Sequence, residues 1–167
     1  MNTTAFNDMP DHSRVWIYQS GRVISDLEAT EIRKRAAMFL LDWSSHGSVM
    51  RAVIEVVYNR FIVVMVDEGV AAASGCGIDK SVRFMQQLEQ DYGMNLFDRL
   101  LVLYRDAEGK LQDTKLQYFE RFLETGEVKP SQIVFNNLIA TKTDLFTKWE
   151  VPVTQSWHAR LLPVNAR

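Results

Sequence analysis

Seven residues with the types and spacing to bind a ligand lie between the end of an apolar run and the start of a predicted helix. These candidate ligand-binding residues are Asp67, Ser74, Gly75, Gly77, Asp79, Lys80 and Ser81. Glycine lets the backbone approach a bound group closely, and the unpaired N–H groups at a helix N-terminus attract anions. We therefore expect this segment to bind a small anionic ligand or to contact a protein partner.

The segment SGCGIDKS, which ends at Ser81, matches a phosphate-binding loop only in part. The pattern G-x-x-x-x-G-K-[ST] places glycines six residues and one residue before its lysine. Those places hold Ser74 and Asp79, and an aspartate beside a phosphate would repel it. The spacing therefore disfavours nucleotide hydrolysis. A degenerate nucleotide-binding protein that uses Asp67, Lys80 and Ser81 around a magnesium phosphate stays open as an alternative.

Cys76 is the only cysteine, and it precedes the predicted helix. Backbone N–H groups and the helix dipole favour a thiolate at such a place. Cys76 could then be a nucleophile with His46 or His158 as its general base. A thiol-dependent enzyme is thus one alternative, and a small buried cysteine that packs a crowded turn is the structural alternative.

Metal and cofactor sites are not indicated by the remaining polar residues. The chain has three histidines, but no H-x-H or H-E-x-x-H spacing occurs. One cysteine can form neither an intramolecular disulfide nor a cysteine-rich zinc site. We therefore expect no metal and no cofactor.

The composition is that of an ordinary globular domain. The 167 residues are 47% hydrophobic and 24% charged, and the formal net charge is −2. The negative charge is divided equally between the two halves of the chain, so neither half carries the positive charge that binding to phosphate backbones usually needs. A nucleic-acid partner is therefore disfavoured.

The first residues and the lengths of the apolar runs indicate the cellular location of the protein. The start MNTTAFNDMPDHSR has no basic segment followed by a long apolar run, so it does not predict a secretory signal. The longest apolar run, Phe61 to Val66, is far shorter than the roughly 20 residues of a membrane-spanning helix. With a single cysteine, these features predict a cytoplasmic protein that does not span a membrane.

The apolar pattern predicts alternating strands and helices up to residue 105. Strands are expected at 15–19, in a hairpin over 49–66, and around 100–106. A helix is expected from Ser25, whose spacing to Glu28 matches a capping box, and another precedes Gly93. Later segments predict a helix that ends at Gly126, a strand at QIVF and a short helix that follows Thr141.

This order predicts an α+β protein with a ferredoxin-like βαββαβ core, an antiparallel sheet with helices on one face. We expect residues 1–13 to be loose and residues 14–167 to form a single α+β domain. The mixed C-terminal extension would add an edge strand, cover an open edge or build a dimer contact. A homodimer is therefore possible.

Several segments together carry a resemblance to a known group of proteins. These segments are DWSSHG, YNRFIVVMVDE, SGCGIDKSV, FDR, VFNNLIATK, WEVP and SWHARL. They resemble an uncharacterised family of small bacterial proteins, mainly from Bacteroidetes, whose members are often labelled ABC transporter ATPase. The resemblance covers nearly the whole chain after the first residues and implies no established activity. The chain has neither P-loop glycine and no LSGGQ signature, so its motifs do not support the ATPase label.

The leading functional hypothesis is a ligand- or protein-binding α+β domain whose small-residue loop lies at a helix N-terminus. Its alternatives are the thiol-dependent enzyme and the degenerate nucleotide-binding protein.

Overall fold

A computed structural model describes residues 4–45, 48–69 and 75–163. The chain divides into two compact units, each of which is described by itself. The first unit comprises Met1–Asp98 and Ala140–Thr143, and the second comprises Arg99–Ile139 and Asp144–Arg167. We expected residues 14–167 to form a single domain. The division into two compact units does not decide this, so the single domain stays a prediction.

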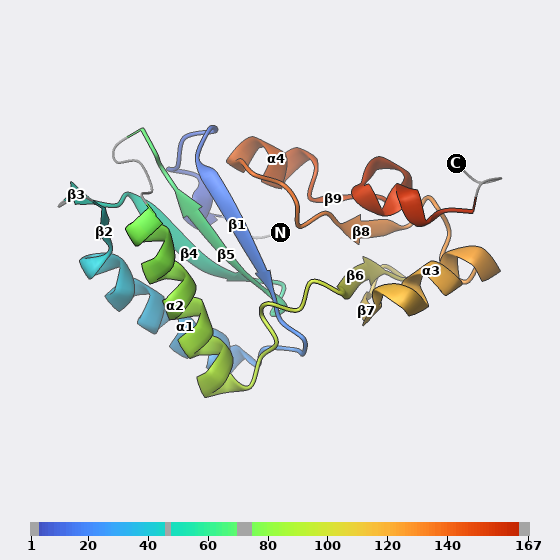
Figure 1. Cartoon of the computed structure of the whole chain (residues 1–167), viewed down its shortest axis with the longest axis horizontal. Coiled ribbons are helices and arrows are strands. Elements are labelled where there is room, and N and C mark those ends of the chain that lie inside the picture. The colour runs from blue at the N-terminus through green and yellow to red at the C-terminus, as the bar shows by residue number, and fades with distance from the viewer. Residues whose placement is uncertain (1–3, 46–47, 70–74, 164–167) are drawn as a thin grey trace. The chain divides into compact units, whose positions relative to one another are not determined.

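The first unit is built on a three-stranded antiparallel sheet with the order β1-β5-β4 (Figure 1). Its elements are η1 (Thr4–Phe6), β1 (Arg14–Gln19), α1 (Asp26–Asp42), β2 (Ser44–Ser45), β3 (Ser48–Val49), β4 (Ala52–Val57), β5 (Phe61–Val66) and α2 (Gly75–Tyr92). Strands β2 and β3 form a separate two-stranded ribbon. β5 is central in the larger sheet, and all six of its side chains are buried.

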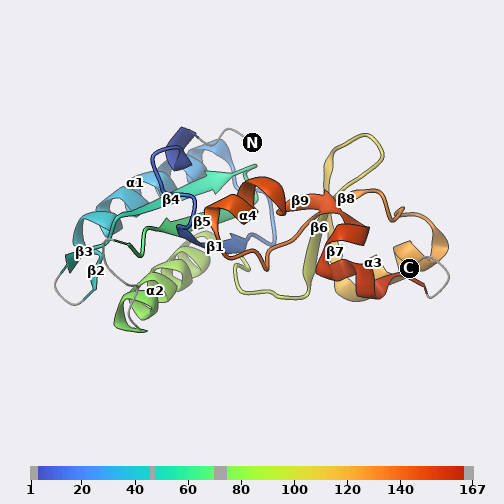
Figure 2. The same cartoon turned by 90° about the horizontal axis from the view of Figure 1, so that it is seen from above.

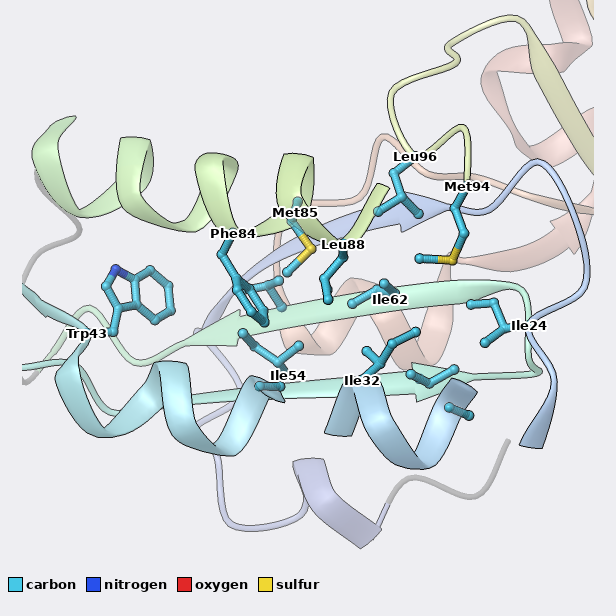
Figure 3. Packing of buried hydrophobic residues seen from close by; sticks show 14 of the residues in the cluster. Ile24, Ile32, Trp43, Ile54, Ile62, Phe84, Met85, Leu88, Met94 and Leu96 are labelled. Carbon is cyan, nitrogen blue, oxygen red and sulfur yellow. The ribbon is translucent and has the colours of Figure 1, made fainter. Parts of the chain in front are cut away.

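Helices α1 and α2 pack on the same face of this sheet (Figure 1). Alternate residues of β5, beginning with Ile62, point into the core that both helices cover. Figure 3 shows Ile32 of α1 and Phe84 and Leu88 of α2 converging on Ile54 and Ile62. The expected arrangement, an antiparallel sheet with helices on one face, is therefore present in this unit.

The opposite face of β5 is buried as well. Phe61, Val63 and Met65, which alternate with the helix-facing residues, are fully buried. In the N-terminal segment, which we expected to be loose, residues 4–13 include the 3-10 helix η1, which contacts β4. Phe6 and Met9 of this segment are buried too.

The ends of the two long helices follow the signals in the sequence. Ser25 caps α1 as predicted, because its side chain accepts from the Glu28 backbone N–H while the Glu28 carboxylate accepts from the Ser25 N–H. Gly93 follows α2 with a φ of 61°, a left-handed conformation that glycine adopts without strain.

The turn between β4 and β5 has an unusual composition. Tyr58 and Asn59 have φ values of 55° and 51°, and the Arg60 N–H donates to the Val57 carbonyl at 3.1 Å. Two successive residues with positive φ correspond to a type I′ turn, which normally prefers Asn-Gly. This turn therefore contains Tyr58 and Asn59 and no glycine, although its conformation favours glycine.

The second unit contains a four-stranded antiparallel sheet with the order β7-β6-β8-β9 (Figure 2). Its elements are β6 (Leu101–Arg105), β7 (Leu111–Lys115), α3 (Leu116–Thr125), β8 (Ile133–Phe135), β9 (Glu150–Pro152), η2 (Val153–Gln155) and η3 (Trp157–Leu161). Helix α4 (Lys142–Thr147) begins in the first unit and ends in the second. A core that includes Val102, Phe119 and Val134 holds this unit together.

The α+β class is confirmed, and the elements through α2 follow the predicted order. The antiparallel sheets and helices are compatible with an α+β ferredoxin-like core. One strand departs from the expected pairing: β6, predicted as the fourth strand of the core, pairs instead with β7 and β8. Periodicity locates a strand, but its partners depend on contacts distant in sequence.

Candidate functional site

The predicted ligand-binding segment forms the start of α2. The helix begins at Gly75, and Ser74 lies outside the described residues. Cys76, Asp79 and Lys80 are exposed in the first turns. This end of α2 therefore presents a thiol, a carboxylate and an amine to solvent.

Two of the predicted ligand-binding residues, Gly77 and Ser81, are buried and hydrogen-bonded within the protein. Gly77 is buried, and its carbonyl oxygen accepts a hydrogen bond of 2.9 Å from the Trp43 indole Nε1. Ser81 is also buried, and its hydroxyl donates to the Ile78 carbonyl at 2.8 Å. The Gly77 carbonyl therefore joins α2 to Trp43, whereas the Ser81 hydroxyl bonds within α2 itself.

Asp67, directly after β5, lies at the centre of a group of polar side chains. The residue is only 3% exposed. Its Oδ1 accepts from the Gly69 backbone N–H at 2.9 Å and lies 3.5 Å from His12 Nε2. Its Oδ2 lies 3.3 Å from Arg51 Nη1. Both carboxylate oxygens thus have partners within the protein.

The sheet brings these partners together. Strand β4 runs antiparallel to β5 with Ala52 opposite Val66, so the residue before β4 lies beside the residue after β5. The Asp67 N–H accordingly donates to the Arg51 carbonyl at 2.9 Å. Arg14 of β1 also lies opposite Val66, which brings the segment with His12 to the same end of the sheet.

His12 and Arg51 reach Asp67 while much of each side chain stays in solvent. The His12 side chain is 69% exposed, and the Arg51 side chain is 48% exposed. Arg51 Nη2 also donates to the Asp8 carbonyl at 2.5 Å, which fixes the guanidinium from a second side. The buried carboxylate therefore orients two basic groups at the surface.

Sequence reasoning did not identify His12 or Arg51 as site residues. His12 lies in a segment without periodicity, and Arg51 belongs to no motif. The antiparallel register could have indicated Arg51, because a turn centred on Tyr58 and Asn59 pairs residue 51 with residue 67. No comparable signal connects His12 with Asp67.

The three residues predicted for thiol catalysis are not brought together as one described site. Cys76 is exposed in the first unit, His158 belongs to the second unit, and His46 lies outside the described residues. The described histidine that belongs to the same unit as Cys76 is His12.

His158 is a packed residue of the second unit. It is 1% exposed, and its Nδ1 lies 2.9 Å from the Ser156 hydroxyl oxygen. Its ring stacks on Trp157, with centroids 3.8 Å apart, and meets Phe119 edge-on. Burial, aided by the positive charge of Arg160, lowers the pKa of His158 to about 4. The imidazole is therefore held neutral at pH 7.

Residues 4–45, 48–69 and 75–163 contain neither a metal-binding cluster nor a membrane-spanning helix. No cluster of three or more His, Cys, Asp or Glu side chains in these ranges could hold a metal ion. No helix of the same ranges combines the length and the apolar character of a membrane span.

Comparison with known proteins provides no relative from which a role could be transferred. The chain matches no protein-family model, no curated protein and no solved structure. The family resemblance of the sequence segments stays a prediction. Function is therefore inferred from the residues of the sites themselves.

Proposed function

We propose that the protein binds a small anionic ligand, such as a carboxylate or a phosphate, at the end of β5. Arg51 and His12 are its contacts. The observation that supports this most is the buried Asp67, whose two carboxylate oxygens lie near a guanidinium and an imidazole that come from two separate segments and reach the surface. Binding an anion to donors that are already oriented costs less side-chain conformational entropy than binding it to free side chains.

The charge of Asp67 offsets part of the positive charge of Arg51, so an anion on the outer side of these groups would be bound mainly through hydrogen bonds. The Asp67 oxygens are turned to Gly69, His12 and Arg51, and the residue is shielded from solvent. A guanidinium carries five N–H donors, and Arg51 directs two of its terminal nitrogens to Asp67 and to Asp8. The exposed part of the guanidinium is suited to paired hydrogen bonds with a carboxylate or phosphate.

The start of α2 adds support from the helix dipole. Its first turn contains no acidic residue, so no carboxylate there offsets the partial positive charge of the helix N-terminus. The exposed Asp79 and Lys80 carry opposite charges at this end of the helix, so together they add no net charge. The dipole alone therefore favours an anionic ligand there.

Calorimetric titration with inorganic phosphate and with succinate tests this function. The wild type should bind at least one of them, and Arg51→Gln should weaken that binding about tenfold or more, the equivalent of about 1.4 kcal/mol. Arg121→Gln, which removes an exposed arginine of α3, is the matched control and should bind as the wild type does. No binding, or equal losses in both variants, would overturn the proposal.

Thiol chemistry is the second candidate, favoured by the exposure of Cys76 in the first turn of α2. The accessible thiol could attack an electrophile from solvent. For the nucleotide-binding alternative, Asp67 and Ser81 are both buried, and both carboxylate oxygens of Asp67 have partners within the protein, which disfavours a role for either residue at a magnesium ion.

We also propose that the protein binds a protein partner or a second copy of itself. An apolar surface of α1 supports this proposal. Leu27, Met38 and Leu41 are about 70% exposed and lie on one face of the helix, opposite its buried face. We propose a cytoplasmic location, since a chain with a single cysteine forms no internal disulfide that would require an oxidising compartment. Light scattering of the purified chain, with Met38→Lys as the variant, tests self-association through this surface.

A further inference from the structure

A cavity of about 350 Å³ lies at the end of β4 that is far from Asp67. It is bordered by the first residues of η1, by α1, and by the turn into β5. The residues that matter for its chemistry are Thr4, Arg33, Glu55, Val57, Tyr58 and Asn59. Its volume lies at the lower end of the range for small-molecule pockets, roughly 300–1,000 Å³.

Two opposite charges lie side by side in the cavity wall. Arg33 Nε of α1 donates to Glu55 Oε1 of β4, and Arg33 Nη2 donates to the Val56 carbonyl at 2.9 Å. The Val56 N–H donates to the same Glu55 Oε1 at 2.7 Å. The pair is therefore fixed to the backbone of β4 as well as to itself.

Both side chains, which belong to residues that line the cavity, keep unused hydrogen-bonding capacity. Among the residues that the structure describes, Arg33 Nη1 and Glu55 Oε2 have no hydrogen-bond partner. The Arg33 side chain is 43% exposed and that of Glu55 is 20% exposed. A ligand would thus meet a donor group and an acceptor oxygen that neighbour one another.

The turn at the cavity retains two side chains in a strained backbone conformation. Tyr58 and Asn59 both have positive φ, which costs residues other than glycine of order 1 kcal/mol each. The Asn59 amide donates to Asp26 Oδ1 at 2.7 Å, which fixes the turn against the start of α1. Tyr58 and Asn59 both border the cavity.

We propose that this cavity is a second binding site, which takes a free α-amino acid. The carboxylate accepts hydrogen bonds from Arg33, the ammonium group donates to Glu55, and the side chain lies toward Val57 and Tyr58. A simple anion would be repelled by Glu55, and a simple cation by Arg33. Because these two residues are in direct contact, the ligand must carry its two charged groups close together, as an α-amino acid does with both groups on one carbon.

Nuclear magnetic resonance titration of the full chain tests this site without any mutation. The probes are the standard L-α-amino acids, with acetate, methylammonium and γ-aminobutyrate as ligands that lack one charge or separate the two. At least one α-amino acid should give saturable shifts at the amides of Glu55, Tyr58 and Asn59. No saturable shifts there, or equal shifts with acetate or γ-aminobutyrate, would overturn the proposal.

Variants separate ligand binding from a purely structural role of the charged pair. Arg33→Gln and Glu55→Gln should each weaken amino-acid binding about tenfold, the equivalent of about 1.4 kcal/mol. The exposed pair of Glu31 and Lys34 on the same helix provides the control, because Lys34→Gln removes one partner of a 3.0 Å ion pair outside the cavity. Undiminished binding by Arg33→Gln would contradict the site.

The competing explanation is that the pair shields the edge of the sheet. Among the described residues, β4 pairs with β5 alone, and Arg33 and Glu55 cover the outward backbone groups of Val56. If shielding were the whole role, Arg33→Gln would self-associate in gel filtration, and the wild type would bind no amino acid.

Discussion

The indole Nε1 of Trp43 donates a hydrogen bond of 2.9 Å to the carbonyl oxygen of Gly77. Trp43 is the C-cap residue of α1, and Gly77 lies in the first turn of α2, so one buried contact joins the end of one helix to the start of the other. A glycine that we expected to border a ligand thus holds the helix that carries the exposed thiol, carboxylate and amine.

Trp43→Phe should destabilise the protein by about 1–3 kcal/mol, because it removes the buried hydrogen bond and leaves a space beside Gly77. Chemical denaturation measures this loss. Trp16→Phe is the control: Trp16 is only half-buried, and phenylalanine keeps a ring beneath the Arg14 guanidinium. Equal losses in the two variants would show that the contact with Gly77 contributes nothing specific.

His158 should make stability depend on pH between about 6.5 and 4. Its pKa of about 4 in the folded protein lies below its ordinary value of 6.5, so the unfolded chain takes up a proton first as the pH falls. This contribution is complete above pH 6.5 and is lost as the pH falls toward 4, by about 3 kcal/mol at most.

The pH profile of His158→Gln, compared with the wild type, isolates this contribution from that of other titrating groups. The difference in unfolding free energy should change over this interval and be flat above pH 7. Titration of the His158 ring near pH 6.5 in the native protein would contradict the expectation.

Glu28 should stabilise the protein at neutral pH and lose this effect in acid. Paired hydrogen bonds from Arg22, at 2.6 and 3.0 Å, together with the Ser25 backbone N–H, lower the pKa of Glu28 to about 2. Its contribution is present above pH 4.5 and is lost as the pH falls toward 2. Arg22 also donates to the Tyr92 carbonyl, so the pair connects α1 with the end of α2.

Glu28→Gln should therefore cost about 1 kcal/mol or more at pH 7, as the loss of a helix N-cap contact usually does. The cost should shrink as the pH approaches 2. Denaturation at both pH values measures it, with the more exposed Glu31→Gln as the control. A cost that is the same at both pH values would exclude the ionised carboxylate as its source.

Cys76 should be fully modified by a water-soluble thiol reagent in the native protein, because its side chain is exposed. Absorbance at completion should correspond to one thiol per chain, and Cys76→Ser should give none. Modification that occurs only after unfolding would place the thiol in the core and remove the support for thiol chemistry.

Local signals made much of the fold predictable. The Ser25 capping box marked the start of α1, and Gly93 and Gly126 marked the ends of α2 and α3. The partners of β6 were not predictable, because an apolar strand fits either sheet and its choice depends on distant contacts.

The candidate sites were less accessible to sequence reasoning than the elements. Asp67 was identified by its place at the end of an apolar strand, but His12 and Arg51 reach it only through the register of three strands. The cavity lined by Arg33 and Glu55 depends on residues 22 positions apart that follow no motif. Chemistry assembled across strands leaves no local pattern.

The most direct test of anion binding is an amide-resolved titration of the wild type with inorganic phosphate and succinate. The account predicts saturable shifts at the backbone amides of Asp67, Gly69 and Arg51, and their loss in Arg51→Gln. No saturable shifts, or saturable shifts elsewhere that persist in Arg51→Gln, would contradict it.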